Sequence, residues 1–168
     1  MYNKLLTRRS VRKYSEQQVS DELLDKVLAA GLWAPTAKNN QTPVMVAVRD
    51  KEPRDLLSKI NAEIMGVETD PFYGAPCVIV VLADPALGTW IDDGSLVMGN
   101  LLNAAHALDL GSCWINRARE TFDRPEGKEL LKKWGLPESY RGIGNCILGY
   151  AEEDPAPKER REGRILKV

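Results

Sequence analysis

The sequence is poor in the residues that build metal sites and disulfide frameworks. Its 168 residues include a single histidine, His106, and three widely spaced cysteines without a CxxC pair. Zinc sites and disulfide scaffolds need clustered ligands or an even set of cysteines, so we expect neither, and no metal. We interpret Cys77, Cys113 and Cys146 as free thiols of a reducing, cytoplasmic compartment.

Long apolar runs and nucleotide-binding glycine motifs are also missing. The longest apolar run, residues 75–83, contains a proline and is far shorter than the roughly 20 residues that span a bilayer. Residues 1–12 lack the apolar core of a signal peptide. We therefore expect no membrane association. No GxGxxG stands between a strand pattern and a helix pattern, which argues against a Rossmann-type dinucleotide site.

The composition indicates one ordinary folded domain with an uneven charge. With 43% apolar and 28% charged residues, we expect a single domain over residues 1–168, ending in an extended, charged tail from about 151 to 168. The net charge is only −1, yet residues 4–13 hold five cations and no acid, and residues 158–167 hold five cations against two glutamates. Two basic ends on an acidic body indicate a local anion site rather than a nucleic-acid surface.

Hydrophobic periodicity predicts a series of helices. Ser20 is a good helix N-cap, and apolar residues at helical spacing follow it until Pro35 ends the helix. Further helices are expected over residues 56–64, 90–109 and 130–134.

Strands are expected between these helices, where β-branched residues are dense. About four core strands with mixed helices predict an α+β fold, with helices packed on a small sheet. The final segment, "RILKV", could pair as an added strand. The expected core strands cover residues 43–48, 76–83, 112–116 and 143–150.

The helix expected over residues 90–109 is apolar on several faces, which is typical of a helix buried in a core or an interface. Gly94 and Gly99 would let neighbouring backbones approach it closely. Asp92 and Asp93 fall in its first turn, and we interpret them as partners of the helix dipole rather than as a catalytic dyad.

The basic stretch "RRSVRKY", residues 8–14, is the clearest indication of a ligand. Arginine side chains bind phosphate oxygens through two parallel hydrogen bonds, and a serine hydroxyl adds a donor. Lys158 and Arg160 at the other end of the chain could converge with this stretch on a phosphate monoester. Alone, the stretch could equally be a solvated basic tail or an RNA-binding arm.

Two further motifs offer polar groups without acid–base residues. The loop "APTAKNNQTP", residues 34–43, could match a uracil-like edge, although an ordinary polar connection would look the same. In "LGSCWIN", residues 110–116, backbone N–H groups could face a ligand, or the segment could simply pack tightly. Cys113 lacks a patterned base and is interpreted as an inert thiol, and His106 as structural. Together the motifs favour an enzyme whose cofactor does the chemistry.

The order of these motifs resembles the nitroreductase family of flavoproteins. "RRSVRKY", "APTAKNNQ", "LGSCWI" and the terminal "PKERRE" follow the family's order between about residues 4 and 165. The resemblance implies a mostly antiparallel sheet of four to five strands flanked by helices, in an intertwined homodimer with FMN at its interface. It also implies that NADH or NADPH reduces nitroaromatics, quinones or similar electron-poor acceptors in a ping-pong hydride transfer.

The resemblance also assigns residues to the flavin, and none to acid–base catalysis. The cations of both chain ends would hold the phosphate, and the N-terminal group also the ribityl chain. The loop after the first long helix would reach the flavin from the other subunit, and one strand would lie beside the isoalloxazine. The residues implied are Arg8, Arg9, Ser10 and Arg12; Pro35, Thr36, Ala37, Asn39 and Gln41; Cys113, Trp114 and Ile115; and Lys158 and Arg160.

Three departures from the family leave the substrate open. Thr42-Pro43 stands where the family often has proline and an aromatic residue after the glutamine. Residues 66–76 do not show the amide and lysine that larger members place on the flavin, and the chain lacks their helical insertions. A non-catalytic flavin-binding sensor would share all of these motifs and stays an alternative, as does a flavin-consuming or dehalogenating relative on the same fold.

Overall fold

The computed structural model describes residues 2–168, which form an α+β fold around one four-stranded sheet. The strand order is β1-β2-β4-β3, and all three pairings are antiparallel. The predicted fold class is therefore confirmed, but residues 164–168 form no fifth strand in this sheet and are exposed. The strands are β1 (Val44–Val48), β2 (Cys77–Ala83), β3 (Gly111–Ile115) and β4 (Arg141–Gly149).

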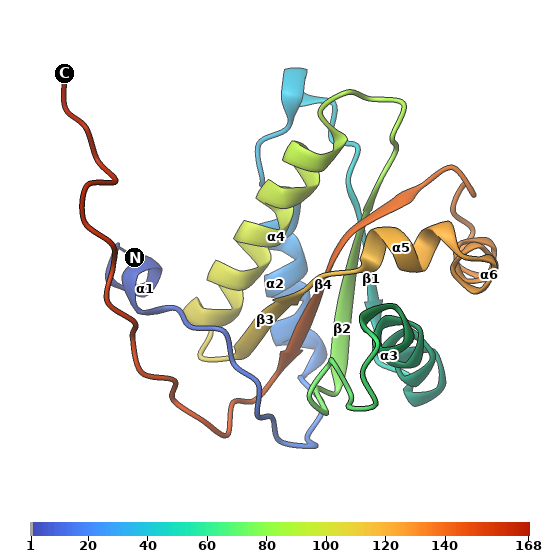
Figure 1. Cartoon of the computed structure of the whole chain (residues 1–168), viewed down its shortest axis with the longest axis horizontal. Helices are drawn as coiled ribbons and strands as arrows, with labels where there is room; N and C mark the ends of the chain where they lie inside the picture. Colours follow the sequence, from blue (N-terminus) through green and yellow to red (C-terminus); the bar gives the residue numbers. More distant parts are fainter. Residues whose placement is uncertain (1) are drawn as a thin grey trace.

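Helices cover both faces of the sheet (Figure 1). Side chains of successive strand residues point to opposite faces, so the central strand β2, which is buried throughout, supplies both apolar clusters. Each cluster is closed by its own helices. On one face lie α2 (Asp21–Leu32) and α4 (Trp90–Ala107), and on the other α3 (Lys51–Met65), α5 (Ala118–Asp123) and α6 (Pro125–Lys133).

The predicted long helices are confirmed, and two short ones were missed. Ser20 caps α2 as expected, because its side chain accepts a hydrogen bond from the Leu23 N–H. The helix α1 (Tyr2–Thr7) lies on the surface and buries none of its residues. With six residues each, α1 and α5 are also too short for a helical period to be recognised.

The orientation of α4 corrects one expectation about its glycines. A Cβ on Gly94 would lie 2.4 Å from Ile143 Cγ1, so close approach at Gly94 serves packing against β4 of the same chain. Nothing lies within 4 Å of such an atom on Gly99. Leu101 is fully buried in its own chain's core, whereas Ile91 and Leu96 on the outer face are 41% and 48% exposed.

The tightest glycine predicts a large stability effect. A Cβ on Gly127 would lie 2.1 Å from the backbone oxygen of Thr121, which no rotamer change can relieve. We expect Gly127→Ala to lower the free energy of unfolding by about 1–3 kcal/mol or more, as measured by urea denaturation. Gly88→Ala is the control, because nothing lies within 4 Å there and its effect should stay within about 0.5 kcal/mol. Equal losses in both variants would contradict this packing.

Candidate cofactor-binding site

The basic N-terminal stretch lies along the outer edge of the sheet. Ser10 forms a parallel bridge with Ser112 of the edge strand β3, and the Val11 N–H donates to the Ser112 carbonyl at 3.1 Å. Further on, Tyr14 pairs antiparallel with Ala151, where the C-terminal tail begins. The stretch is therefore held between the sheet and the tail.

The tail then passes back along the N-terminal cations. The Arg12 N–H donates to the Glu153 carboxylate, and the Glu152 N–H donates to the Lys13 carbonyl at 2.9 Å. The two cation clusters consequently meet in one pocket of about 280 Å³, as the charge pattern predicted. Its lining is Arg8, Arg9, Ser10, Arg12, Pro155, Ala156, Lys158 and Arg160.

The charge in this pocket is not balanced within the described chain. Arg8, Arg12, Lys158 and Arg160, called here the four unpaired cations, form no ion pair among residues 2–168. Like charges gathered in a small volume repel each other unless an anion joins them. Arg9 differs, because its Nη1 donates to two backbone carbonyls at the end of α1, both at 2.9 Å.

Helix α1 is fastened to the C-terminal end of α4. Lys4 Nζ donates to the His106 carbonyl at 3.3 Å and pairs with Asp109 at 2.6 Å, and the Thr7 hydroxyl contacts His106 Nε2 at 2.8 Å. Burial lowers the pKa of His106, and the nearby charges of Lys4 and Arg8 lower it further. A neutral His106 that anchors α1 fits the structural interpretation of this residue, and it places Arg8 at the pocket.

On the side of the pocket, strand β3 exposes backbone N–H and C=O groups, whereas its side chains pack into the apolar clusters. Cys113 and Ile115 point into one apolar cluster, and Trp114 packs against the other. Because Ser112 presents its carbonyl to Val11, the N–H and C=O groups of Trp114, two residues on, face the same outer edge. The buried Ser112 hydroxyl has no hydrogen-bond partner among the described residues.

The loop after α2 is polar and is held by hydrogen bonds. It contains the 3₁₀ turn η1 (Ala37–Asn39), and the Ala37 N–H donates to the buried Asp93 carboxylate at 2.9 Å. The Gln41 N–H donates to the Thr36 hydroxyl at 3.0 Å, and its side-chain amide donates to Asn39 at 3.1 Å. Asp93 therefore anchors this loop, a role that its interpretation as a dipole partner did not include.

The loop and the basic pocket lie at opposite ends of α4 (Figure 1). The loop is attached at Asp93, whereas α1 is attached at His106. At 1.5 Å per residue, these two anchor points are about 20 Å apart along the helix axis. Within one chain, the structure does not bring the loop residues Pro35, Thr36, Ala37, Asn39 and Gln41 into the basic pocket.

Sequence reasoning missed three residues of this site and placed one of them within a motif. Ser112 stands inside "LGSCWIN", but only the structure shows that it meets Ser10. Pro155 and Ala156 line the pocket without a chemical signal of their own, because neither carries a polar side chain. Residues 2–168 contain no group of three His, Cys, Asp or Glu side chains placed to hold a metal ion. Over the same range, no helix combines the length and apolar character needed to cross a bilayer.

The fold and pocket define a class of protein, an α+β domain with a basic pocket at the edge of an antiparallel sheet. The chain belongs to the nitroreductase family, whose sequence model matches residues 5–150. A curated protein from Archaeoglobus fulgidus, provisionally named NADH dehydrogenase/NAD(P)H nitroreductase, is 35% identical over 89% of this chain and 84% of its own.

Solved structures show the same likeness over the whole chain. The crystal structure of a nitroreductase with bound FMN from Bacteroides fragilis has a TM-score of 0.90 and 30% identity, and the match covers 99% of this chain and 97% of that one. A nitroreductase with bound FMN from Desulfitobacterium hafniense has a TM-score of 0.88 and 27% identity, with the same coverage.

Proposed function

We propose that this protein is an FMN-dependent oxidoreductase that uses NADH or NADPH to reduce small electron-poor acceptors, such as nitroaromatics or quinones, by ping-pong hydride transfer. The observation that carries the proposal is the convergence of the four unpaired cations in one pocket. A phosphate monoester carries about two negative charges near pH 7 and offers three acceptor oxygens. FMN ends in such a group, and the names of the relatives agree with this cofactor and with an NAD(P)H donor.

The residues present fit FMN at two points. The four unpaired cations would bind the phosphate. The outward N–H of Trp114 would face the ring system along the edge of β3. Bound FMN supplies the ring that accepts and gives up hydride. The side chains of Cys113 and Ile115 would support the strand from the core rather than touch the cofactor.

We propose a homodimer in which the loop over residues 35–41 of one subunit reaches the flavin of the other. The separation of loop and pocket along α4 supports this arrangement, because one chain holds them at opposite ends. Large apolar side chains on the surface support it too. Leu32 and Trp33 beside the loop are 71% and 86% exposed, and Leu96 on α4 is 48% exposed.

The free cysteines and the basic pocket support a proposal for the cellular compartment and for the kind of ligand. Cys77, Cys113 and Cys146 are all free and buried, which fits the reducing cytoplasm that we propose. Since the pocket gathers its cations at one point, we propose that it serves a small phosphate ligand and not a nucleic acid.

The purified protein is expected to be yellow and to release FMN on denaturation. Anaerobic NADH or NADPH should bleach the flavin absorbance, and a quinone or nitroarene should restore it. Colourless protein that also fails to bind FMN after reconstitution would contradict the proposal. Flavin that binds but is not reduced by either nicotinamide would favour the non-catalytic sensor, and loss of the flavin ring during turnover would favour a flavin-consuming relative.

A further inference from the structure

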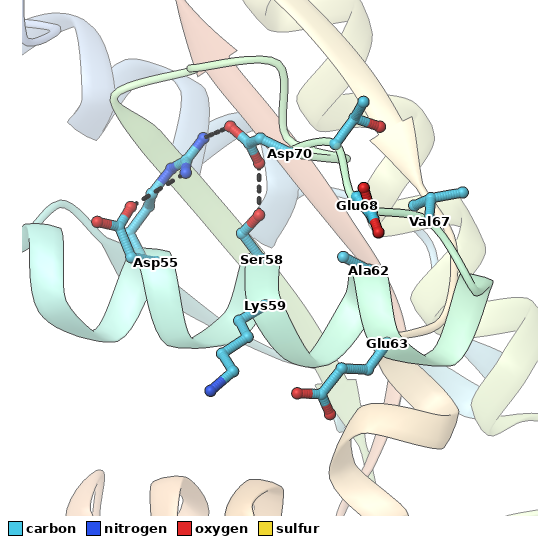
Figure 2. A pocket seen from close by; sticks show the side chains of 10 residues that line it. Asp55, Ser58, Lys59, Ala62, Glu63, Val67, Glu68 and Asp70 are labelled. Atoms are coloured by element: carbon cyan, nitrogen blue, oxygen red, sulfur yellow. Dashed lines mark hydrogen bonds and ion pairs between the residues drawn. The ribbon is translucent and has the colours of Figure 1, made fainter.

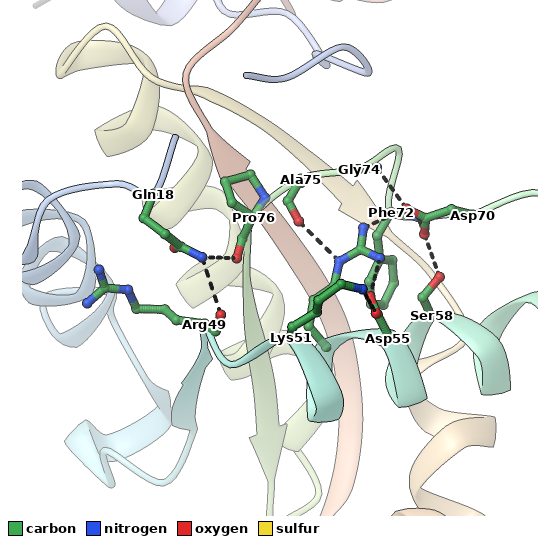
Figure 3. A network of polar contacts seen from close by, with 11 residues as sticks. Gln18, Arg49, Lys51, Asp55, Ser58, Asp70, Phe72, Gly74, Ala75 and Pro76 are labelled. Carbon is green, nitrogen blue, oxygen red and sulfur yellow. Dashed lines mark hydrogen bonds and ion pairs between the residues drawn. The ribbon is translucent and has the colours of Figure 1, made fainter. Parts of the chain in front are cut away.

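A single carboxylate organises the turn between α3 and β2. Figure 2 shows Asp70 facing α3, and Figure 3 shows the network around it. Asp70 Oδ2 accepts from Arg54 Nη2 at 2.6 Å and from the Gly74 N–H at 2.7 Å. Its Oδ1 accepts from the Phe72 N–H at 2.8 Å and from the Ser58 hydroxyl. Burial raises the pKa of Asp70, but the hydrogen bonds from Ser58 and Arg54 outweigh burial and hold it below its usual range.

Arg54 makes the turn rigid from the helix side. Only 11% of its side chain is exposed, its Nε donates to the Ala75 carbonyl at 3.1 Å, and its guanidinium lies 5.6 Å from the ring centroid of the fully buried Phe72. Asp70 also binds the N–H groups on both sides of Tyr73. The backbone at position 73 is therefore fixed by its neighbours.

Tyr73 itself sits in an unfavourable backbone conformation. Its φ of 52° lies in the left-handed region, which glycine and asparagine adopt far more easily than a bulky aromatic residue. The side chain is 43% exposed, so core packing does not explain the choice of tyrosine. Strain that a network maintains at an exposed residue points to a role outside the turn.

The Tyr73 ring contacts an arginine of the basic pocket, which indicates what this role is. The Arg12 guanidinium carbon lies 5.8 Å from the ring centroid, within the range of a cation–π interaction. Arg12 is one of the four unpaired cations of the basic pocket. We propose that Tyr73 is a positioning residue, which the Asp70 turn holds against Arg12 so that its guanidinium is set for the FMN phosphate. This inference rests on the proposed function.

An aromatic partner suits this task better than an acidic one. A carboxylate would occupy the guanidinium N–H groups and would compete with phosphate for them. A ring attracts the cation through its face and leaves the N–H groups in the guanidinium plane free. An exposed arginine that is already held in place also loses less side-chain conformational entropy when the cofactor binds.

The test compares FMN affinity in three variants of the apoprotein, measured by quenching of flavin fluorescence. Tyr73→Phe keeps the ring and should bind FMN within about twofold of the unchanged protein. Tyr73→Asn tolerates the left-handed backbone but removes the ring, and should raise the Kd about three- to fivefold. Tyr73→Gly, which relieves the strain, is a second ringless variant with the same expected loss, so a folding defect in one leaves the other informative.

Combining the Tyr73 and Arg12 substitutions shows whether Tyr73 acts on FMN affinity through Arg12 or only supports the fold. In an Arg12→Ala background, Tyr73→Asn should cause no further loss, whereas in an Arg8→Ala background the full loss should persist. Losses that add in both backgrounds, or a Phe variant as weak as the Asn variant, would overturn the positioning role while FMN binding stands. Failure of the unchanged apoprotein to bind FMN would instead overturn the proposed function, and this inference with it.

Discussion

Replacing Arg8 with alanine is expected to raise the Kd for FMN about ten- to a hundredfold, with little change in the urea midpoint. Arg8 lines the pocket, and no carboxylate among the described residues pairs with its side chain. The variant would therefore remove the proposed charge-assisted phosphate contact, worth about 1.5–3 kcal/mol, without breaking an internal ion pair. Lys158→Ala removes a cation from the other end of the chain and should also weaken FMN.

Lys51→Ala is the control for the loss of a positive charge. Lys51 lies outside the pocket and pairs with Asp55 on the surface of α3, so FMN affinity should not change. Titration of the three apoproteins with FMN at fixed ionic strength makes the comparison direct. Equal losses in all three would show that the N-terminal arginines are ordinary solvated charges.

A lysine at Leu96 is expected to abolish the dimer and the bound flavin together. Leu96 is exposed on the outer face of α4, so a charge there leaves the chain's own core intact but places an unpaired ammonium in the proposed interface. Leu101 on the same helix is unsuitable for this experiment, because it is fully buried in its own subunit. Sedimentation, flavin content and far-ultraviolet circular dichroism measure the three properties separately.

Met65→Lys is the matched control for that experiment. Met65 is 46% exposed, close to the exposure of Leu96, but it ends α3 on the opposite face of the sheet. It should leave both dimer and flavin unchanged. A folded monomer of the Leu96 variant that keeps its full FMN would refute the shared site.

The sequence revealed most of the elements, because the strands are dense in β-branched residues and the long helices repeat every three to four residues. It could not tell which face of α4 meets a partner, because helical periodicity shows which residues share a face but not what that face contacts. Leu101 and Leu96 illustrate this limit, as both are apolar and only one is buried.

The site was predictable to the extent that it depends on charge. The sequence indicated that the two cation clusters lie together, because two basic segments on an otherwise acidic chain suggest a shared anion site. The placement of Ser112 against Ser10 depends on strand order, and the contact between Tyr73 and Arg12 depends on a turn conformation. Neither follows from the identity of the residues, although Asp70, Pro71 and Gly74 do mark a turn.

The basic pocket joins a segment that precedes α2 with a segment that follows β4, and this sets an order of events during synthesis. The sheet is complete once β4 has been made, at Gly149, whereas the pocket needs Lys158 and Arg160, which leave the ribosome later. Domains fold largely as the chain emerges, so the core can form before the basic pocket is complete. We therefore expect FMN to bind only after the tail has been made, and a chain truncated shortly after β4 should keep its sheet but lose Lys158 and Arg160 from the pocket.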